Sequence, residues 1–386
     1  MDYFLTEQQI EMRNLAREIA LKSVLPVRAE LDEKEEFPWD LMKIFADAGF
    51  FSVFIPEEYE GLGGGSLDLC IVVEEISRIC SGVAVSYAAT ALGTYPILLF
   101  GNDAQKRKYL PDIASGKKLT AFAITEAEAG SDAGATRTTA AKKDDGYVLN
   151  GTKQWITNGG EAEIYTVVAM TNPAKGARGA STFIVEKGTP GFTFGKKEKK
   201  LGIRSSATRE LIFDNCFVPA ENLLAKEGYG FITAMKTFDN TRPGIGAQAV
   251  GIAQGSLDEA VNYSRIRKQF GKPISSLQAI QHMLADMATQ TEAARALVYH
   301  AARVIDSKAK NISKLSAMAK LFASDTAMKV TIDAVQVMGG YGYMKDYPVE
   351  KMMRDAKITQ IYEGTNQIQR NVIALELIKE AAGRKG

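Results

Sequence analysis

The 386-residue chain contains few of the side chains that bind metal ions or form disulfides. It has only two histidines, His282 and His300, and three cysteines. The spacing of Cys70, Cys80 and Cys216 matches neither a disulfide framework nor a zinc site. We therefore expect no metal ion and no His-dependent catalytic triad, and we interpret both histidines as packing or helix-face residues. A reducing compartment is the simplest setting for three unpaired thiols.

An excess of charge of either sign is also missing. The net charge is +1, with 24% charged residues, so no basic field exists to attract nucleic acid or anionic lipid. The first twenty residues mix charges into an amphipathic pattern, without a signal or transit pattern. We identify no uncharged apolar stretch near the ~20 residues that cross a bilayer and expect no membrane insertion. We expect a cytoplasmic protein, although a processed mitochondrial matrix protein would have the same composition.

What the chain does have is 46% hydrophobic residues, enough for two or three domains. Residues 1–118 show helical periodicity, with a possible capping box at Thr6 and Gln9. Helices are predicted over 39–48, 67–79 and 104–114. The periodicity changes near Leu119, and residues 119–229 contain short segments rich in β-branched and aromatic residues. From residue 230 to 386 the periodicity is helical again.

These patterns predict an α+β multidomain protein. In the middle domain, Asn150-Gly151 is a hairpin signal, and the density of strands without helices favours an antiparallel β-barrel or sandwich. In the last domain, helices predicted over 230–265, 276–306, 312–338 and 366–381 are joined by short loops. Such helices favour an antiparallel four-helix bundle.

Two glycine-rich segments resemble nucleotide-binding loops without matching them. Glu60–Ser66 (EGLGGGS) lacks the Gly-Lys-Ser/Thr of a phosphate loop and the final glycine of Gly-x-Gly-x-x-Gly. Residues 244–251 (GIGAQAVG) lie inside a helical pattern rather than after a strand. We interpret the first as an ordinary loop and the second as a close helix contact, and a Rossmann dinucleotide site is not supported.

Glu363 is the only charged residue between Lys357 and Arg370. A carboxylate in an apolar setting has a raised pKa and can act as a base near neutral pH. Gly364 leaves room for a substrate, and Thr365 can cap a helix that begins near Asn366. The alternative is an acid that pairs with a lysine or arginine on the surface.

Two further sets of residues could bind an aromatic, phosphate-bearing cofactor. Thr125, Trp155 and Thr157 could form a wall for a flat ring, unless they are ordinary strand residues. Ser131 lies in a turn whose N–H groups could bind phosphate. Arg267 could bind a diphosphate and Phe270 could stack on adenine, unless the segment is a solvated basic loop.

Two other segments leave similar alternatives open. Gly339 and Gly340 permit close approach of a ligand to the backbone, but they could equally end a helix. Asp239 and Arg242, three residues apart on one helix face, could grip a polar ligand or form a surface ion pair.

The order of the motifs is more specific than any one of them. FAITExxAGSD, WIT, FDNTRP, RKQFGKPI, QVMGGYGY and IYEGTNQIQR follow one another along the chain. In this order they resemble the acyl-CoA dehydrogenase family, especially its short- and medium-chain members. The resemblance implies the helical–β–helical order and a homotetramer that binds FAD. The implied reaction is α,β-dehydrogenation of an acyl-CoA to the trans-2-enoyl-CoA. The base removes the α-proton, a hydride moves to flavin N5, and the electrons pass to electron-transferring flavoprotein.

The resemblance also assigns roles to residues. Glu363 matches the catalytic base; the alternative base position of isovaleryl and long-chain members is Thr241 here, which cannot serve. FAD contacts are implied for Phe122, Ile124, Thr125, Trp155, Ile156, Thr157, Arg267, Phe270, Gln278, Gln336, Gly339, Gly340, Thr365 and Gln367, with Gln336 and Gly340 reaching the FAD of a neighbouring subunit. Substrate contacts are implied for Ser131, Thr90, Asp239, Arg242, Tyr362 and Gly364.

The acyl group is less defined. The segment that lines the acyl pocket in this family, residues 86–96 here, is rich in small side chains such as Thr90 and Gly93. Small side chains favour a short, branched or cyclic acyl group, unless they only allow close helix packing. Residues 82–105 contain no lysine or arginine, which disfavours a dicarboxylate. Three alternatives remain: oxidation of an alicyclic acyl-CoA, an acyl-CoA oxidase that uses O2, and a non-enzymatic relative.

Overall fold

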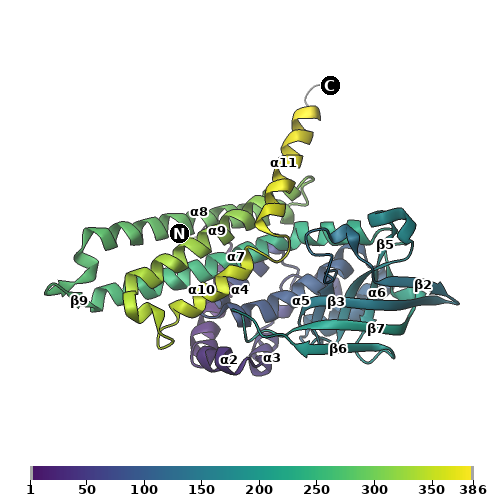
Figure 1. Cartoon of the computed structure of the whole chain (residues 1–386), viewed down its shortest axis with the longest axis horizontal. Helices are drawn as coiled ribbons and strands as arrows, with labels where there is room; N and C mark the ends of the chain where they lie inside the picture. Colours follow the sequence, from purple (N-terminus) through teal and green to yellow (C-terminus); the bar gives the residue numbers. More distant parts are fainter. Residues whose placement is uncertain (1–2, 384–386) are drawn as a thin grey trace.

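Residues 3–383 are described in a computed structural model, in which a β domain lies at one end and long helices extend to the other (Figure 1). The N-terminal part contains α1 (Glu7–Ile19), α2 (Arg28–Lys34), α3 (Trp39–Asp47), α4 (Ser66–Ser77), α5 (Ser81–Phe100) and α6 (Asp103–Ala114). The capping box of α1 is confirmed: the Thr6 side chain accepts a hydrogen bond from Gln9 N, and the Gln9 side chain accepts one from Thr6 N.

The predicted order of helical, β and helical domains is confirmed. The strands of the middle part are β1 (Thr120–Ala123), β2 (Thr139–Lys143), β3 (Gly146–Thr157), β4 (Ile164–Met170), β5 (Ala180–Glu186), β6 (Phe192–Lys197), β7 (Thr208–Pro219) and β8 (Leu223–Leu224). The C-terminal part contains α7 (Gly230–Ile266), the hairpin β9 (Lys268–Gln269) and β10 (Lys272–Pro273), α8 (Gln278–Asp306), α9 (Ser313–Met338), α10 (Val349–Thr359) and α11 (Asn366–Gly383). The element type thus changes close to the predicted domain boundaries at 118/119 and 229/230.

Helix α5 corrects the statement that no uncharged stretch approaches twenty residues. It spans 20 residues and is long and apolar enough to cross a membrane by length and composition alone. However, 72% of its most apolar window is buried inside the molecule. It packs on α4, α7 and β1 as a helix of the core, which explains why it shows no amphipathic periodicity.

The β sheet differs from the prediction in two details. Its strands follow the order β6-β7-β3-β2-β4-β5-β8, and β1 pairs with β4 in parallel, so the sheet is mixed rather than purely antiparallel. The expected hairpin at Asn150-Gly151 is wrong, because β3 runs through this dipeptide and the β2–β3 turn is at Asp144-Asp145. Gly151, with φ +142°, lies instead at an irregularity in the pairing of β3 with β7.

The C-terminal helices α7, α8, α9 and α10 pack together, and α11 projects from them (Figure 1). Helix α10 was not predicted; it begins at Val349, directly after the glycine-rich segment that separates it from α9. The close-contact interpretation of residues 244–251 is confirmed: a Cβ atom on Gly251 would lie 2.3 Å from the carbonyl oxygen of Glu74 in α4.

The glycine-rich segment Glu60–Ser66 is an ordinary loop, as predicted. The N-terminus of α4 that follows it is already occupied by an anion from the chain itself. The Asp306 carboxylate accepts hydrogen bonds from Ser66 N (2.6 Å) and Leu67 N (3.0 Å). Because these N–H groups bind Asp306, they are not free to bind a phosphate.

Candidate functional site

The loop that carries Glu363 connects α10 to α11 and has an unusual backbone. Glu363 has φ +51° and Gly364 has φ +90°, both in the left-handed region. For a residue with a side chain this conformation costs roughly 1–2 kcal/mol and requires support from its surroundings. Gln369 gives part of that support, because its Nε2 donates to the carbonyl oxygens of Glu363 (3.1 Å) and Gly364 (2.9 Å).

The Glu363 carboxyl is densely surrounded by protein, although the residue keeps some accessible surface. Burial raises its pKa to about 7, against the opposing effects of the Thr241 hydroxyl and the Arg242 and Lys320 charges. The Thr241 hydroxyl donates to Oε2 at 2.7 Å and fixes the carboxyl. Within residues 3–383, Glu363 forms no ion pair within 4.0 Å, so the alternative of a surface ion pair is not observed.

Asp239 and Arg242 do form an ion pair on α7, at 3.3 Å, but the pair is buried rather than on the surface. Asp239 also accepts from the Ser313 hydroxyl at 2.5 Å. Arg242 Nε donates to the carbonyl oxygen of Glu363 at 3.3 Å. The two residues therefore brace the loop of Glu363, and their contact with a substrate stays a prediction.

An aromatic contact connects this loop to the β domain. Phe122 of β1 packs edge-on against Phe238 of α7, with ring centroids 5.5 Å apart, and the Arg242 guanidinium lies 5.8 Å from the Phe238 ring. Ile124 belongs to the same apolar cluster. The end of β1 thus lies against α7 on the side where Glu363 is held.

Trp155 lies in a bulge of β3, between Lys153 and Ile156. It has φ +56° and is 55% exposed, which is unusual for a tryptophan. The neighbouring Gln154 N donates to the carbonyl oxygen of Thr125 at 2.8 Å, which brings Thr125 beside it. Thr157 follows two residues later, paired with Thr208 of β7. The structure therefore brings Thr125 beside the β3 segment that carries Trp155 and Thr157, and their role as a wall for a flat ring stays a prediction.

Behind this wall lies a buried ion pair that the sequence did not reveal. Lys153, with no exposed surface, donates to Glu126 (2.8 Å), to Thr136 (2.8 Å) and to the carbonyl oxygen of Ile124 (3.0 Å). Burial lowers the pKa of Lys153 to about 8. Burial alone would raise the pKa of Glu126, but the charge and hydrogen bond of Lys153 outweigh it and hold that pKa at about 2. The pair fixes the strand end at Ile124.

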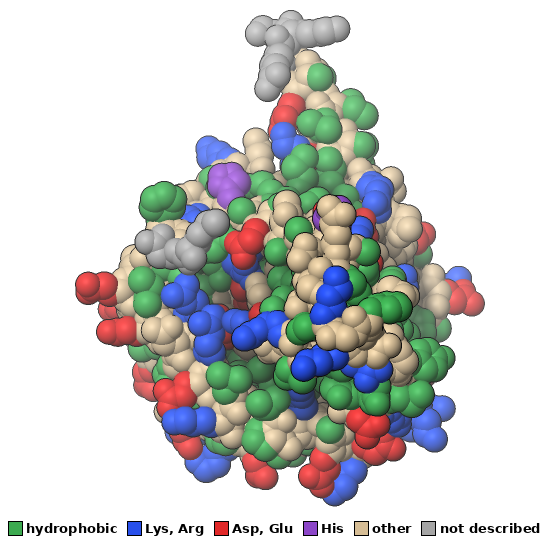
Figure 2. Space-filling model, turned by 90° about the vertical axis from the view of Figure 1, so that its left-hand side faces the viewer, with side chains coloured by type: hydrophobic (Ala, Val, Ile, Leu, Met, Phe, Trp, Pro, Cys, Tyr) green, Lys and Arg blue, Asp and Glu red, His purple; other side chains and the backbone are tan. Residues whose placement is uncertain are grey.

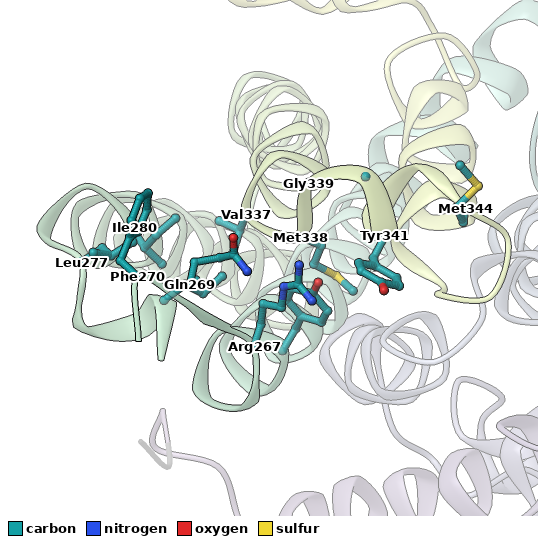
Figure 3. Close-up of a pocket in the computed structure, with 13 residues that line it drawn as sticks. Arg267, Gln269, Phe270, Leu277, Ile280, Val337, Met338, Gly339, Tyr341 and Met344 are labelled. Atoms are coloured by element: carbon teal, nitrogen blue, oxygen red, sulfur yellow. The ribbon is translucent and has the colours of Figure 1, made fainter. Parts of the chain in front are cut away.

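The second set of predicted residues lies at the far end of the helices. Arg267, Phe270, Gly339 and Gly340 line a cavity of about 630 Å³ between the β9–β10 hairpin and the end of α9. Figure 2 looks onto this end and shows lysine and arginine side chains beside hydrophobic ones. Phe270 is 90% exposed, and the Arg267 guanidinium lies over the Tyr341 ring at 5.3 Å (Figure 3). An exposed phenylalanine beside a free guanidinium suits an adenine and a diphosphate.

The remaining predicted residues are distributed around these two regions. Tyr362 and Gly364 flank Glu363. The Thr365 hydroxyl accepts from Ile368 N at 3.3 Å, as expected of a helix cap. Gln367 is exposed in the first turn of α11, Gln278 begins α8, Gln336 lies in the last turn of α9 and Ser131 is exposed in its turn.

Thr90 is a buried residue of α5 that faces β1, and its carbonyl oxygen accepts from the Thr120 hydroxyl at 2.6 Å. A Cβ atom on Gly93 would lie 2.6 Å from Ala121 N. Close packing therefore accounts for these two small residues, and a role for Thr90 in the acyl pocket stays a prediction.

Sequence analysis missed two polar residues beside Glu363. Lys320 of α9 is buried and donates to the carbonyl oxygen of Gly364. Gln248 of α7 is buried and accepts from the Tyr362 hydroxyl. A lysine among alanines on an apolar helix face, as in Ala317–Ala323, was the available signal for Lys320.

Three family models match the chain, together covering most of it. They describe the N-terminal domain of acyl-CoA dehydrogenases at residues 6–117, the middle domain at 121–216 and the C-terminal domain at 228–378. Among curated relatives, an acyl-CoA dehydrogenase of Bacillus subtilis is 53% identical, over 97% of this chain and 98% of its own length. Cyclohex-1-ene-1-carbonyl-CoA dehydrogenase of Syntrophus aciditrophicus is 50% identical, over 97% of this chain and 91% of its own length.

Solved structures agree with the sequence comparison. Butyryl-CoA dehydrogenase of Megasphaera elsdenii superimposes with a TM-score of 0.95 at 47% identity, over 98% of this chain and 100% of that one. A second solved chain gives a TM-score of 0.95 at 51% identity, over 98% of this chain and 99% of that one. It comes from a structure of the electron transferring flavoprotein of Acidaminococcus fermentans that concerns flavin-based electron bifurcation.

Proposed function

Because the chain belongs to the acyl-CoA dehydrogenase family of FAD-dependent oxidoreductases, we propose that Glu363 is the base that removes the α-proton of a short acyl-CoA. The resemblance drawn from the motifs is confirmed for the family, the fold, the flavin cofactor and the acyl-CoA dehydrogenase activity. The roles of single residues, the acyl group, the electron acceptor and the assembly belong to the proposal.

The observation that carries this proposal is the state of the Glu363 carboxyl. Its pKa is raised to about 7 by burial, and a general base is most effective when its pKa lies near the working pH. The Thr241 hydroxyl orients one oxygen and leaves the other without a hydrogen bond among residues 3–383. A carboxyl in this state can accept a proton from carbon.

The backbone of Glu363 supports the same role. Its N–H group donates to no acceptor within residues 3–383, so it can donate to the thioester carbonyl and stabilise the negative charge that develops there. When bound, FAD would supply the acceptor for the hydride of the β-carbon. Trp155 and Thr125 would hold the flavin ring, and Arg267 and Phe270 the diphosphate and the adenine.

A chain of polar side chains beside the base supports a short acyl group. The Tyr362 hydroxyl donates to Gln248 Oε1, and Gln248 Nε2 donates to the Ser81 hydroxyl at 2.7 Å. Gln248 and Ser81 are both buried. A long alkyl chain that displaced these groups would break their hydrogen bonds without replacing them. The likeness to the Megasphaera butyryl-CoA dehydrogenase points the same way.

An alicyclic acyl group is the second candidate, and one specific observation favours it. The relative from Syntrophus aciditrophicus, a cyclohex-1-ene-1-carbonyl-CoA dehydrogenase, is 50% identical to this chain over almost its whole length. A ring is compact, so it too avoids a deep apolar channel. Oxidation by O2 is the remaining alternative and would be recognised by fast reoxidation of the substrate-reduced enzyme in air.

The positions of the cofactor residues support an assembly of at least two copies, and the assembly that we propose is the homotetramer. The hairpin carrying Arg267 and Phe270 and the sheet carrying Trp155 lie at opposite ends of the chain (Figure 1), so one FAD would need residues of two copies. The likeness to a chain studied with electron transferring flavoprotein supports that protein as the electron acceptor. Three buried thiols within residues 3–383 suit a reducing compartment, and we place the protein in the cytoplasm.

The test is anaerobic titration of the FAD-loaded enzyme with butyryl-CoA, octanoyl-CoA and cyclohex-1-ene-1-carbonyl-CoA, followed by flavin absorbance. We expect butyryl-CoA to bleach the flavin fastest. Glu363→Gln should lower the bleaching rate by a factor on the order of 10²–10⁴, and Glu376→Gln in α11 should leave it unchanged. Bleaching of Glu363→Gln at the normal rate would reject the base. Fastest bleaching by the cyclic substrate would establish the second candidate.

A further inference from the structure

Lys320 lies in the middle of α9 with none of its surface exposed. Burial of a lysine is costly unless its amine is well paired. Yet among residues 3–383 no carboxylate lies within 4.0 Å of its Nζ, in contrast to the buried Lys153 and Lys351. A buried lysine without a carboxylate partner calls for another explanation.

The Lys320 amine binds the two ends of the segment that follows the base. Nζ donates to the carbonyl oxygen of Gly364 at 2.8 Å and to Asn366 Oδ1 at 2.9 Å. The Asn366 amide is held in turn, because Nδ2 donates to Ser324 (2.9 Å) and Asp325 (2.7 Å) of the same helix. Lys320 therefore attaches the start of α11, and the Gly364–Thr365 peptide, to α9.

This attachment bears on the strained backbone of the loop. Glu363 and Gly364 are both left-handed, and the Gly364 carbonyl that follows them accepts from Lys320 and from Gln369. Two donors on one carbonyl fix the peptide plane next to the base. Loss of the Lys320 contact would leave Gln369 as the single donor and would loosen the direction of the Glu363 side chain and N–H group.

The charge of Lys320 acts on the base as well. Four charged groups face this region: Asp239 and Arg242 from α7, and Lys320 and Asp325 from α9. Burial lowers the pKa of Lys320 to about 7, while Glu363 acts to raise it. In turn, the charge of Lys320 acts to lower the pKa of Glu363, whereas burial raises it. Without this amine the carboxylate of Glu363 would be formed at higher pH.

We propose that Lys320 is a positioning residue for proton abstraction, holding the Gly364–Thr365 peptide of the Glu363 loop in place while its charge favours the carboxylate form of the base. The proposal rests on the role proposed above for Glu363. Lys320 itself does not contact the substrate in this role. Its amine binds the Gly364 carbonyl oxygen and Asn366, and it positions Glu363 through these two residues.

The experiment compares Lys320→Met, which removes both the donor and the charge, with Lys320→Gln, which retains a donor without the charge. Lys329→Met is the matched control, because Lys329 lies on the same helix in an exposed pair with Asp333. The rate of flavin bleaching by butyryl-CoA is measured by stopped flow from pH 6 to 9 and corrected for bound FAD.

For Lys320→Met we expect the rate at pH 7 to fall roughly ten- to a hundredfold, and the half-maximal pH to rise by about one unit. Lys320→Gln should recover much of the maximal rate at high pH but keep the raised half-maximal pH. Lys329→Met should match the unsubstituted enzyme in both the maximal rate and the half-maximal pH.

The proposal is overturned if the Lys320 variants lose only FAD or thermal stability and keep the normal pH profile, since a purely structural lysine would behave so. If Lys320→Met does not fold, the profile of Lys320→Gln decides: an unshifted half-maximal pH refutes the electrostatic role. Failure of the proposed function is distinguishable, because it would show as normal bleaching by Glu363→Gln, whatever the lysine variants do.

Discussion

Two regions of this molecule contrast in how their polar groups are satisfied. In the base region, formed by Thr241, Arg242, Lys320, Glu363 and Gln369, side chains bind one another and the loop backbone. The hairpin end is formed by Arg267, Phe270, Gly339, Gly340 and Tyr341. Here the Arg267 guanidinium has only aromatic rings beside it among residues 3–383, and Phe270 is 90% exposed.

The contrast indicates that the two regions are completed at different stages. A base must be positioned before the substrate arrives, because misplacement lowers the rate directly, so its contacts come from the chain itself. Groups that hold a cofactor have to leave their hydrogen-bonding and stacking surfaces free, and they gain partners only when the cofactor and a neighbouring subunit bind. Substitutions in the base region should therefore change stability, and those at the hairpin end should change cofactor affinity.

The largest expected effect follows from removal of the buried arginine. Arg242→Met leaves the Asp239 carboxylate buried without its charged partner, and loss of one member of a buried ion pair costs about 3–5 kcal/mol. The free energy of unfolding of the FAD-free protein, measured with urea, should fall by that amount. Arg267→Met, the same change at the hairpin end, should alter it by less than about 0.5 kcal/mol. Equal losses in the two variants would contradict the contrast.

A smaller effect is expected from the base itself and depends on pH. The folded-state pKa of Glu363 is raised to about 7, so the protonated form is favoured by folding. Its stabilising contribution is complete below about pH 4.5 and is lost as the pH rises through 7. Glu363→Gln stays neutral, so its free energy of unfolding should exceed that of the unsubstituted protein by about 3 kcal/mol at pH 8 and match it near pH 4.5.

Urea unfolding at the two pH values measures this difference. Glu128→Gln is the control, because its side chain is 75% exposed and pairs only with Arg137 among residues 3–383; it should give no difference that depends on pH. A Glu363→Gln protein that is no more stable than the unsubstituted chain at pH 8 would show that the carboxyl is not desolvated.

The smallest effect in free energy concerns the hairpin end. Phe270→Ala removes a ring that packs on little of its own chain, so the stability of the FAD-free protein should stay within about 0.5 kcal/mol. FAD affinity, measured by quenching of flavin fluorescence, should fall about tenfold, because an aromatic stack contributes roughly 0.5–1.5 kcal/mol beyond its buried area. Phe217→Ala, an exposed aromatic of β7, should leave FAD affinity unchanged. Normal FAD binding by Phe270→Ala would remove Phe270 from the cofactor site.

Particular elements show how far prediction from sequence reached. The long helices α7, α8 and α9 were located within a few residues, because a sustained period of 3.6 is a strong signal. Helix α5 is not predicted from the sequence, since a helix buried on every side has no amphipathic period. Asn150-Gly151 was taken for a turn, and its glycine lies instead at a bulge within a long strand. At that position local turn chemistry was overridden by the pairing of β3 with β7.

The candidate site divides in the same way. Glu363 could be singled out because its segment lacks other charges, and the order of the motifs gave the family. Lys320 and Gln248 could not be assigned a role, because a lysine or glutamine within a helical pattern carries no sign of what it faces across the bundle.

The sequence by itself determined the order of the domains, the family and the identity of the isolated acid. Only the tertiary structure decided that this acid has a pKa near 7, that Thr241 orients it and that Lys320 supports its loop. The reason is physical: desolvation and hydrogen bonding depend on atoms brought together from α7, α9 and the 360–366 loop. These are separated by up to 122 residues along the chain, and no local pattern records their approach.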